Sequence, residues 1–168
     1  MFPIAAILGL AFALPVQPAD PTLPPPTAQL RYTAIGRGVQ IYRCTAQTTT
    51  QPITFQWVFK EPEATLIDPT TGQQLGKHTA GPTWAWKDGS ALVGKVLQKS
   101  SAPDAAAIPW LLLEAHSTGG PGVLSGITLI RRSETQAGIS PTTGCDAQHQ
   151  DNLIRVPYRA TYTFYTAQ

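Results

Sequence analysis

Apolar and aromatic side chains recur at every second position in several short stretches of this chain. The stretch near the C-terminus shows the pattern best, where one set of alternate residues is Tyr158, Ala160, Tyr162 and Phe164. Successive side chains of a β-strand point to opposite faces, so this period predicts strands that each turn one face to a core. A chain built from such stretches is expected to form sheets.

Turn residues separate the alternating stretches. Asp88–Gly89 lies between two of them as in a tight hairpin, because glycine tolerates a positive φ. Short strands between Gly- and Pro-rich turns predict an all-β, single-domain antiparallel β-sandwich or small β-barrel. Pro103–Ala107 is the one helix candidate, with room for a single turn. The predicted strands are Val39–Thr45, Phe55–Phe59, Trp84–Trp86, Ala91–Gln98, Trp110–Ala115, Val123–Arg132 and Tyr158–Tyr165.

Two segments precede this domain. Residues 4–14 carry no charge and form an apolar run of signal-peptide length, well short of the roughly 20 residues that a membrane helix needs. We expect residues 1–19 to be a signal peptide, and the alternative is a buried N-terminal strand or helix. The prolines between Pro15 and Pro26 predict an extended linker over residues 20–29, and the β domain follows over residues 30–168.

The charge of the chain is low for a soluble protein. Charged residues make up 13% of the sequence, against roughly 25% in a typical soluble domain, and the formal net charge is +2. Arg131–Arg132 is the only adjacent basic pair, whereas nucleic-acid binding calls for clustered lysine and arginine. The composition argues against a nucleic-acid partner and favours a secreted, extracellular protein with no membrane span.

The chain has two cysteines, Cys44 and Cys145. In an oxidising extracellular setting an even number of cysteines usually pairs, so we expect one disulfide that closes a loop of about 100 residues. The alternative is two free thiols, with His149 close enough in sequence to Cys145 to form a catalytic pair.

No spacing in the sequence points to a metal centre or a cofactor. The three histidines form no HExxH motif, there is no CxxC, and no glycine-rich loop precedes a helix that would bind phosphate. We therefore expect no metal and no cofactor. Folding alone could bring His78, Asp88 and His116 together, and this is the basis of an enzymatic alternative, either metal-dependent or acid/base.

The segment Gly76–Ser90 is the most unusual part of the sequence. Trp84 and Trp86 fall on one face of a strand near His78, and exposed indoles beside a histidine would form a stacking platform for sugar rings or flat aromatic ligands. The structural alternative is that the tryptophans pack in the core and that Asp88 serves only the turn. The expected core partners are Phe55, Trp57 and Phe59. The candidate ligand-binding residues are His78, Trp84, Trp86, Asp88 and Arg131.

Several motifs occur in an order and spacing that resemble a known family. They are Gly38–Cys44, Gly76-Lys77-His78, Gly81–Trp84, Asp88-Gly89-Ser90, Ile108–Leu113 and Gly144-Cys145-Asp146. With them the chain, over about Leu30–Tyr165, resembles a bacterial and fungal family of secreted proteins known as a domain of unknown function. The resemblance implies a secreted, β-rich domain with paired cysteines and implies no activity. Some fungal members carry a malate dehydrogenase label, which this sequence does not support because it has no βαβ dinucleotide unit.

Three functional hypotheses remain. The leading one is a non-enzymatic extracellular binding protein for carbohydrate or a small aromatic ligand. The second is the enzyme described above, and the third is a structural component of a cell wall or matrix. They differ in where His78, Trp84, Asp88 and Arg131 are expected to lie relative to the largest cavity.

Overall fold

The computed structural model describes residues 19–167, so the expected signal peptide, apart from its last residue, lies outside the described residues. Strands and turns account for the described chain, and no helix occurs in it. The strands are β1 (Gln29–Gln47), β2 (Thr54–Ile67), β3 (Gln74–Thr79), β4 (Thr83–Trp86), β5 (Ala91–Ser100), β6 (Trp110–Ser117), β7 (Leu129–Ala137) and β8 (Leu153–Thr166).

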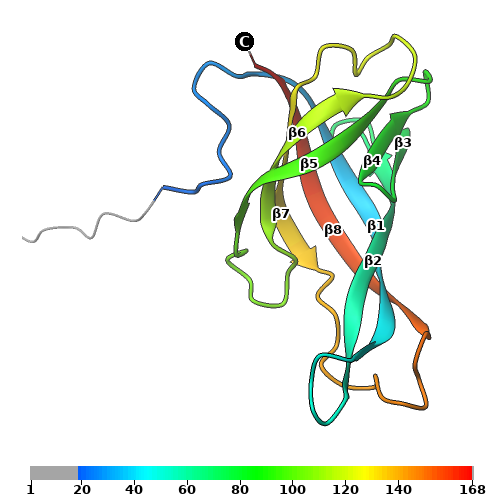
Figure 1. Cartoon of the computed structure of the whole chain (residues 1–168). Coiled ribbons are helices and arrows are strands. Elements are labelled where there is room, and N and C mark those ends of the chain that lie inside the picture. The colour runs from blue at the N-terminus through cyan, green and yellow to red at the C-terminus, as the bar shows by residue number, and fades with distance from the viewer. Residues whose placement is uncertain (1–18, 168) are drawn as a thin grey trace, which may run out of the picture.

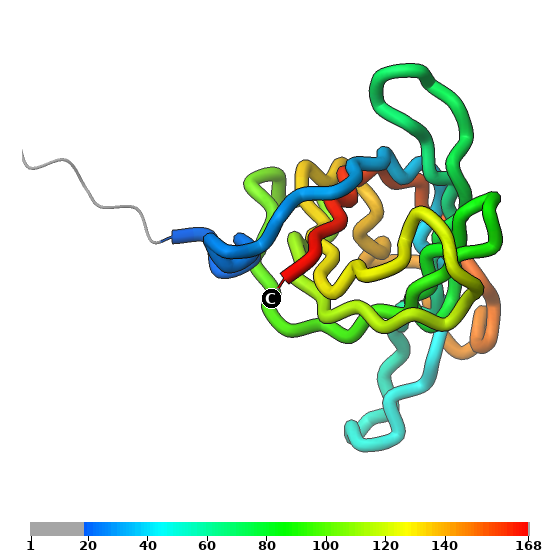
Figure 2. Tube along the Cα trace, turned by 90° about the horizontal axis from the view of Figure 1, so that it is seen from above, coloured from blue at the N-terminus to red at the C-terminus, as the bar shows by residue number. Residues whose placement is uncertain are grey.

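The strands form one closed antiparallel barrel in chain order, and β8 pairs back with β1 (Figure 1). Seen from above, the trace runs around a common centre, and the turn between β1 and β2 projects from the ring (Figure 2). The all-β prediction is confirmed, and the sheet closes into a barrel. The closure leaves no free edge between the first and last strands.

Small residues of β1 make this closure possible. Gly36 lies opposite Ala160 and Ala34 lies opposite Tyr162 in the β1–β8 register. A Cβ atom added to Gly36 would lie 2.5 Å from the Tyr162 ring, which is closer than atoms can pack. The large side chains that β8 sends into the barrel therefore require small residues on the neighbouring strand.

The core fills one end of the barrel. Trp84, Tyr162 and Phe164 are at most 1% exposed, and Trp86 packs edge-on against Phe164 with ring centroids 5.2 Å apart. Tyr158, Ala160, Tyr162 and Phe164 share one face of β8, as predicted, and the structure turns this face inward. The predicted core partners of the tryptophans are wrong, because these partners come from β8. Phe59 of β2 is half exposed.

Two local predictions are wrong, and one strand was not predicted. Residues 123–127 form turns that cover the packed end, and the strand predicted to begin at Val123 begins at Leu129. Pro103–Ala107 forms bends and a turn that ends at an isolated bridge between Ala107 and Gly138, with no helix. The strand β3 was not predicted, because its short sequence has glycine and lysine among few apolar residues.

The lengths of the strands differ greatly, and this leaves a window in the barrel wall. The short β3 meets β2 only over Ala64–Ile67, and the short β4 meets β5 only over Ala91–Val93. Below the β3–β4 turn, the rest of β2 and of β5 therefore face each other without a strand between them (Figure 1). Pro62 lies in β2 just before its pairing with β3 begins, and proline suits such an edge because it has no N–H to donate.

The segment before β1 contacts the outside of the barrel. The Asp20 carboxylate accepts a hydrogen bond from Arg131 Nη2 at 2.7 Å, and Thr22 is fully buried. The Arg131 guanidinium also lies over the Trp110 ring, 5.2 Å from its centroid. Arg131 therefore serves the packing of this segment on the outer face of β7.

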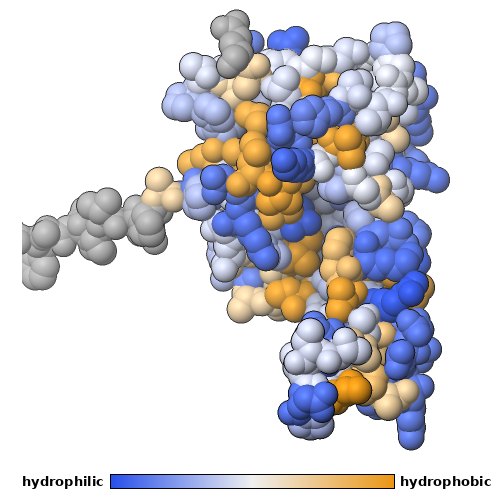
Figure 3. Space-filling view, in the orientation of Figure 1, coloured by the Kyte–Doolittle hydropathy of each residue, from blue (hydrophilic) through white to orange (hydrophobic). Residues whose placement is uncertain are grey.

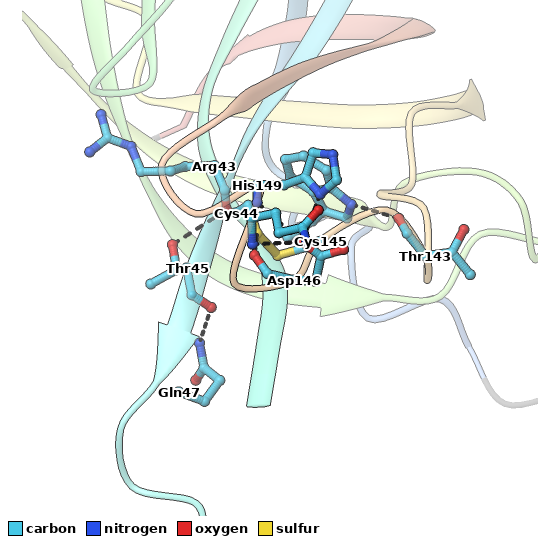
Figure 4. Close-up of a disulfide and its surroundings, with 10 residues drawn as sticks. Arg43, Cys44, Thr45, Gln47, Thr143, Cys145, Asp146 and His149 are labelled. Carbon is cyan, nitrogen blue, oxygen red and sulfur yellow. Dashed lines mark hydrogen bonds and ion pairs between the residues drawn. A yellow bond between two sulfur atoms is a disulfide. The ribbon is translucent and has the colours of Figure 1, made fainter. Parts of the chain in front are cut away.

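Cys44 and Cys145 form the predicted disulfide, with Cα atoms 5.3 Å apart and a separation of 101 positions in sequence (Figure 4). Cys44 is fully buried in β1, and Cys145 belongs to the long connection between β7 and β8. The same connection is held by a hydrogen bond from Trp57 Nε1 to the Thr143 carbonyl, 2.9 Å long. The disulfide excludes the alternative of a thiol catalytic pair.

We predict that replacing both cysteines by alanine lowers the free energy of unfolding by about 4 kcal/mol, because the cross-link restricts a loop of about 100 residues in the unfolded chain. Urea unfolding followed by tryptophan fluorescence measures the change. When the disulfide of the wild-type protein is reduced, we expect its free energy of unfolding to fall by a similar amount. Equal stability of the double variant and the oxidised protein would contradict the prediction.

Candidate functional site

A cavity of about 600 Å³ lies inside the barrel next to the window. Cavities of this size hold small organic ligands, and an eight-stranded barrel is wide enough for one of them. In Figure 3 apolar side chains gather along the middle of the face that carries the window. The lining residues are Gln40, Tyr42, Phe59, Lys60, Pro62, His78, Gly81, Pro82, Trp84, Val96, Lys99, Ile108, Pro109, Leu111, Leu113, Arg132 and Tyr162.

Three aromatic side chains form the inner end of the cavity. His78 stacks on Trp84 with ring centroids 4.3 Å apart. Both rings also make edge-to-face contacts with Tyr162, whose ring centroid lies 5.1 Å from that of His78 and 5.7 Å from that of Trp84. His78 and Trp84 lie directly opposite each other in the β3–β4 register. Each ring is fixed by the other two, so the inner end is a rigid aromatic surface.

His78 is held in its neutral form. Its burial lowers the pKa to about 3, and the nearby positive charge of Arg132 acts in the same direction. His78 Nδ1 lies 2.9 Å from the Thr83 carbonyl oxygen, which can only accept, so Nδ1 carries the proton. His78 Nε2 is consequently a hydrogen-bond acceptor at the inner end of the cavity.

Arg132 is the centre of the polar part of the lining. Its Nε and Nη2 donate to the Pro109 carbonyl at 3.0 and 2.8 Å. Burial raises the pKa of both Tyr42 and Tyr162, and the Arg132 guanidinium opposes this rise at each phenol. The ion pairs among the described residues include none that involves Arg132.

Two buried donors of the lining lack a protein partner. Trp84 Nε1 makes no hydrogen bond within the described chain. Burial raises the pKa of the Tyr158 phenol, and the nearby Gln40 amide opposes this rise. Gln40 Nε2 nevertheless makes no hydrogen bond of ordinary geometry. Donors left in this state destabilise a protein unless a water or ligand accepts from them.

The mouth of the cavity lies at the window and is formed by exposed side chains of its two edges. Phe59 is 50% exposed and Val96 is 49% exposed. Lys60 and Lys99 are also exposed there, and Lys60 forms an ion pair with Glu61. The mouth therefore combines apolar surface with two cations, one of which has an acidic partner.

The structure brings only two of the five candidate ligand-binding residues to this cavity, which are His78 and Trp84. Trp86 and Asp88 border a separate hollow at the end of β4, beside the turns that follow β2 and β4, and Arg131 lies on the outer face. Trp84 and Trp86 are 1% and 9% exposed, so they do not form the exposed stacking platform that the sequence suggested. Trp84 instead presents its ring to an interior cavity.

Asp88 holds the β4–β5 turn, as the structural alternative for this residue predicted. One carboxylate oxygen accepts from the Ser90 hydroxyl at 2.6 Å, and the other accepts from the Val123 amide at 2.7 Å. The Ser90 hydroxyl and the backbone amides of Val123 and Ser90 together lower the pKa of Asp88. Gly89 has a φ of 88° and is the only residue of this turn with a positive φ, which is typical of a three-residue hairpin loop that ends in a left-handed glycine.

The residues of the enzymatic alternative do not converge. His78 is buried in the interior, whereas His116 points outward from β6 and pairs with Glu114 at 3.5 Å. Asp88 is occupied by the turn. No group of three metal-ligating side chains occurs within residues 19–167, and the interior His78 faces no carboxylate in the cavity lining.

Apart from His78, the polar residues of the lining were not predicted. Arg132 is one of two adjacent arginines, and strand alternation requires one of them to face inward. Ile130 is fully buried, so the same parity points Arg132 into the barrel and Arg131 out of it. The sequence carried this signal, but it could not show which parity faces the interior.

The fold and the cavity define a small closed β-barrel with an internal, mainly apolar pocket. The family described as protein of unknown function (DUF3455) matches residues 24–166, and the chain belongs to this family. No curated protein and no solved structure gives a match. No helix among the described residues is long and apolar enough to cross a membrane.

We predict that His78 makes the protein acid-sensitive. The folded-state pKa of about 3 lies below the ordinary value of 6.5, so the unfolded chain takes up a proton first as the pH falls below 6.5. The free energy of unfolding should therefore fall by about 2 kcal/mol from this source between about pH 7 and pH 5. Urea unfolding at both pH values measures the loss.

The variant His78→Gln is expected to lose less stability over the same interval than the wild-type protein. The exposed His116 is the matched control, and His116→Gln should keep the wild-type pH dependence. If the free energy of unfolding falls by the same amount in His78→Gln and in the wild-type protein, the buried histidine does not cause the acid sensitivity.

Proposed function

We propose that this protein is a secreted, non-enzymatic binding protein that holds a small, largely apolar or aromatic ligand inside its barrel. The observation that carries the proposal is the cavity of about 600 Å³ beside a window in the wall. A barrel of this size can be filled completely by its own side chains. Here the packed core occupies one end, and the other end remains hollow and accessible.

The lining supports an aromatic or aliphatic ligand over a free sugar. Leu111, Leu113 and Ile108 give the walls an apolar character, and the stacked His78–Trp84 pair offers a flat aromatic surface. A sugar would need several polar groups around its ring, whereas an apolar ring gains from dehydrating these walls. The shortage of charged residues in the whole chain fits the proposed extracellular setting.

We predict that N-phenyl-1-naphthylamine, an uncharged probe whose fluorescence rises in apolar surroundings, binds this cavity. Val96 lines the mouth and is 49% exposed, so Val96→Trp should narrow the entrance without disturbing the core. We expect the variant to bind the probe at least about tenfold more weakly. Fluorescence titration at constant protein concentration measures this change.

Leu97→Trp is the matched control, because Leu97 is the next residue of the same strand, is similarly exposed at 47%, and does not line the cavity. This control should bind the probe as the wild-type protein does. Equal effects of the two substitutions would place the probe on the outer surface. Absence of saturable binding to the wild-type protein would refute the proposed function.

A further inference from the structure

The cavity has an electrostatic asymmetry that the apolar walls do not explain. Three cationic side chains line it, Lys60, Lys99 and Arg132, and no aspartate or glutamate does. The chain as a whole is nearly balanced, with twelve lysines and arginines against ten acidic residues. The positive charge is therefore concentrated at this cavity by the fold.

The two lysines have an explanation that involves no ligand. Both belong to the unpaired strand edges at the window, and lysine on an exposed edge keeps other strands from pairing with it. Lys60 also has its own acidic partner in Glu61. The lysines are thus compatible with an anionic ligand but do not argue for one.

Arg132 has no such explanation. It lies opposite Tyr162 in the β7–β8 register and is directed into the barrel, where the Pro109 carbonyl is its hydrogen-bond partner. That carbonyl engages Nε and Nη2, and the Tyr162 phenol also lies near the guanidinium, so these partners of Arg132 are neutral groups. A guanidinium in a low-dielectric cavity without a counter-charge destabilises the protein, and an oxyanion that accepts two parallel bonds would offset this.

Two independent features point the same way. Trp84 is 1% exposed and Gln40 is 2% exposed, and both carry a buried N–H group without a partner while lining this cavity. Arginine, indole and amide N–H groups are all donors. A lining with unsatisfied donors and one positive charge is complementary to a ligand that brings acceptors and a negative charge.

We propose that the natural ligand is a small amphiphilic anion, with an aromatic or aliphatic body against His78 and Trp84 and an oxyanion group bound by Arg132. This inference rests on the proposed function, because it names the class of ligand that the same cavity takes. The oxyanion group is a carboxylate or a group of similar shape and charge. The lysines at the mouth attract the anion, and Arg132 holds it.

The test compares two probes with the same aromatic body. These are 8-anilinonaphthalene-1-sulfonate, which is an anion, and N-phenyl-1-naphthylamine, which is uncharged. We expect Arg132→Gln to weaken binding of the anionic probe by about tenfold or more and to change binding of the neutral probe by less than about threefold. Both affinities come from fluorescence titration of the full mature chain.

Arg131→Gln is the matched control, since it removes the same charge from the adjacent residue on the outer face. It should leave both affinities within about threefold of the wild-type values. If the two arginine variants weaken the anionic probe equally, net charge causes the effect and the inference is wrong. If the neutral probe binds and is blocked by Val96→Trp while Arg132→Gln changes nothing, cavity binding stands and the anion assignment fails.

A second measurement needs no variant and remains informative if Arg132→Gln fails to fold. The preference of the wild-type protein for the anionic probe is measured between about 0.05 M and about 0.5 M sodium chloride. Charges exposed at the mouth are screened at the higher salt, whereas the partly buried Arg132 is screened much less. A preference that persists supports Arg132 as the binding group, and a preference that disappears at high salt overturns this role.

Discussion

The pairing of β1 with β8 is the constraint on which the rest of this structure depends. The two strands run antiparallel from Gln29↔Thr166 to Arg43↔Leu153, and this ladder converts a meander of strands into a closed barrel. The interior side chains of β8 are large, and those of β1 are small where the two strands meet. Closure at this seam sets the position of Tyr162, around which both the packed core and the cavity are arranged.

The cavity follows from the unequal lengths of the strands. The long β1, β2 and β8 extend beyond the short β3–β4 hairpin. The barrel wall is therefore complete at the end that holds the hairpin, and at the opposite end it has a window. Bulky rings and the turns over residues 123–127 fill the complete end. At the open end a bridge between Ala107 and Gly138 joins the connections after β5 and β7, and the Cys44–Cys145 disulfide secures the second of them. The hollow end is thereby stabilised without being filled.

Much of the architecture was predictable from local pattern, and most of the site was not. The alternation of Tyr158, Ala160, Tyr162 and Phe164 identified one face of a strand correctly, and the Asp88–Gly89 pair identified its hairpin. Alternation separates the two faces of a strand but does not say which one meets the interior. That ambiguity explains why Arg131 was chosen over Arg132. It also explains why the aromatic residues of β2 were assigned to the core, although Phe59 borders a window that only the lengths of other strands create.

The polar groups at the cavity come at the expense of stability. A guanidinium without an acidic partner, an indole N–H without an acceptor and a histidine kept neutral by burial each destabilise the folded state relative to an apolar residue of similar size. The closed seam, the disulfide and the packed end stabilise the same domain and keep it folded in spite of them. Residues fixed by packing on neighbouring strands lose little further entropy when a ligand arrives. The rigidity of these residues and their effect on stability support the proposed ligand binding over a purely structural role, because a wall or matrix component would gain more from a filled apolar interior.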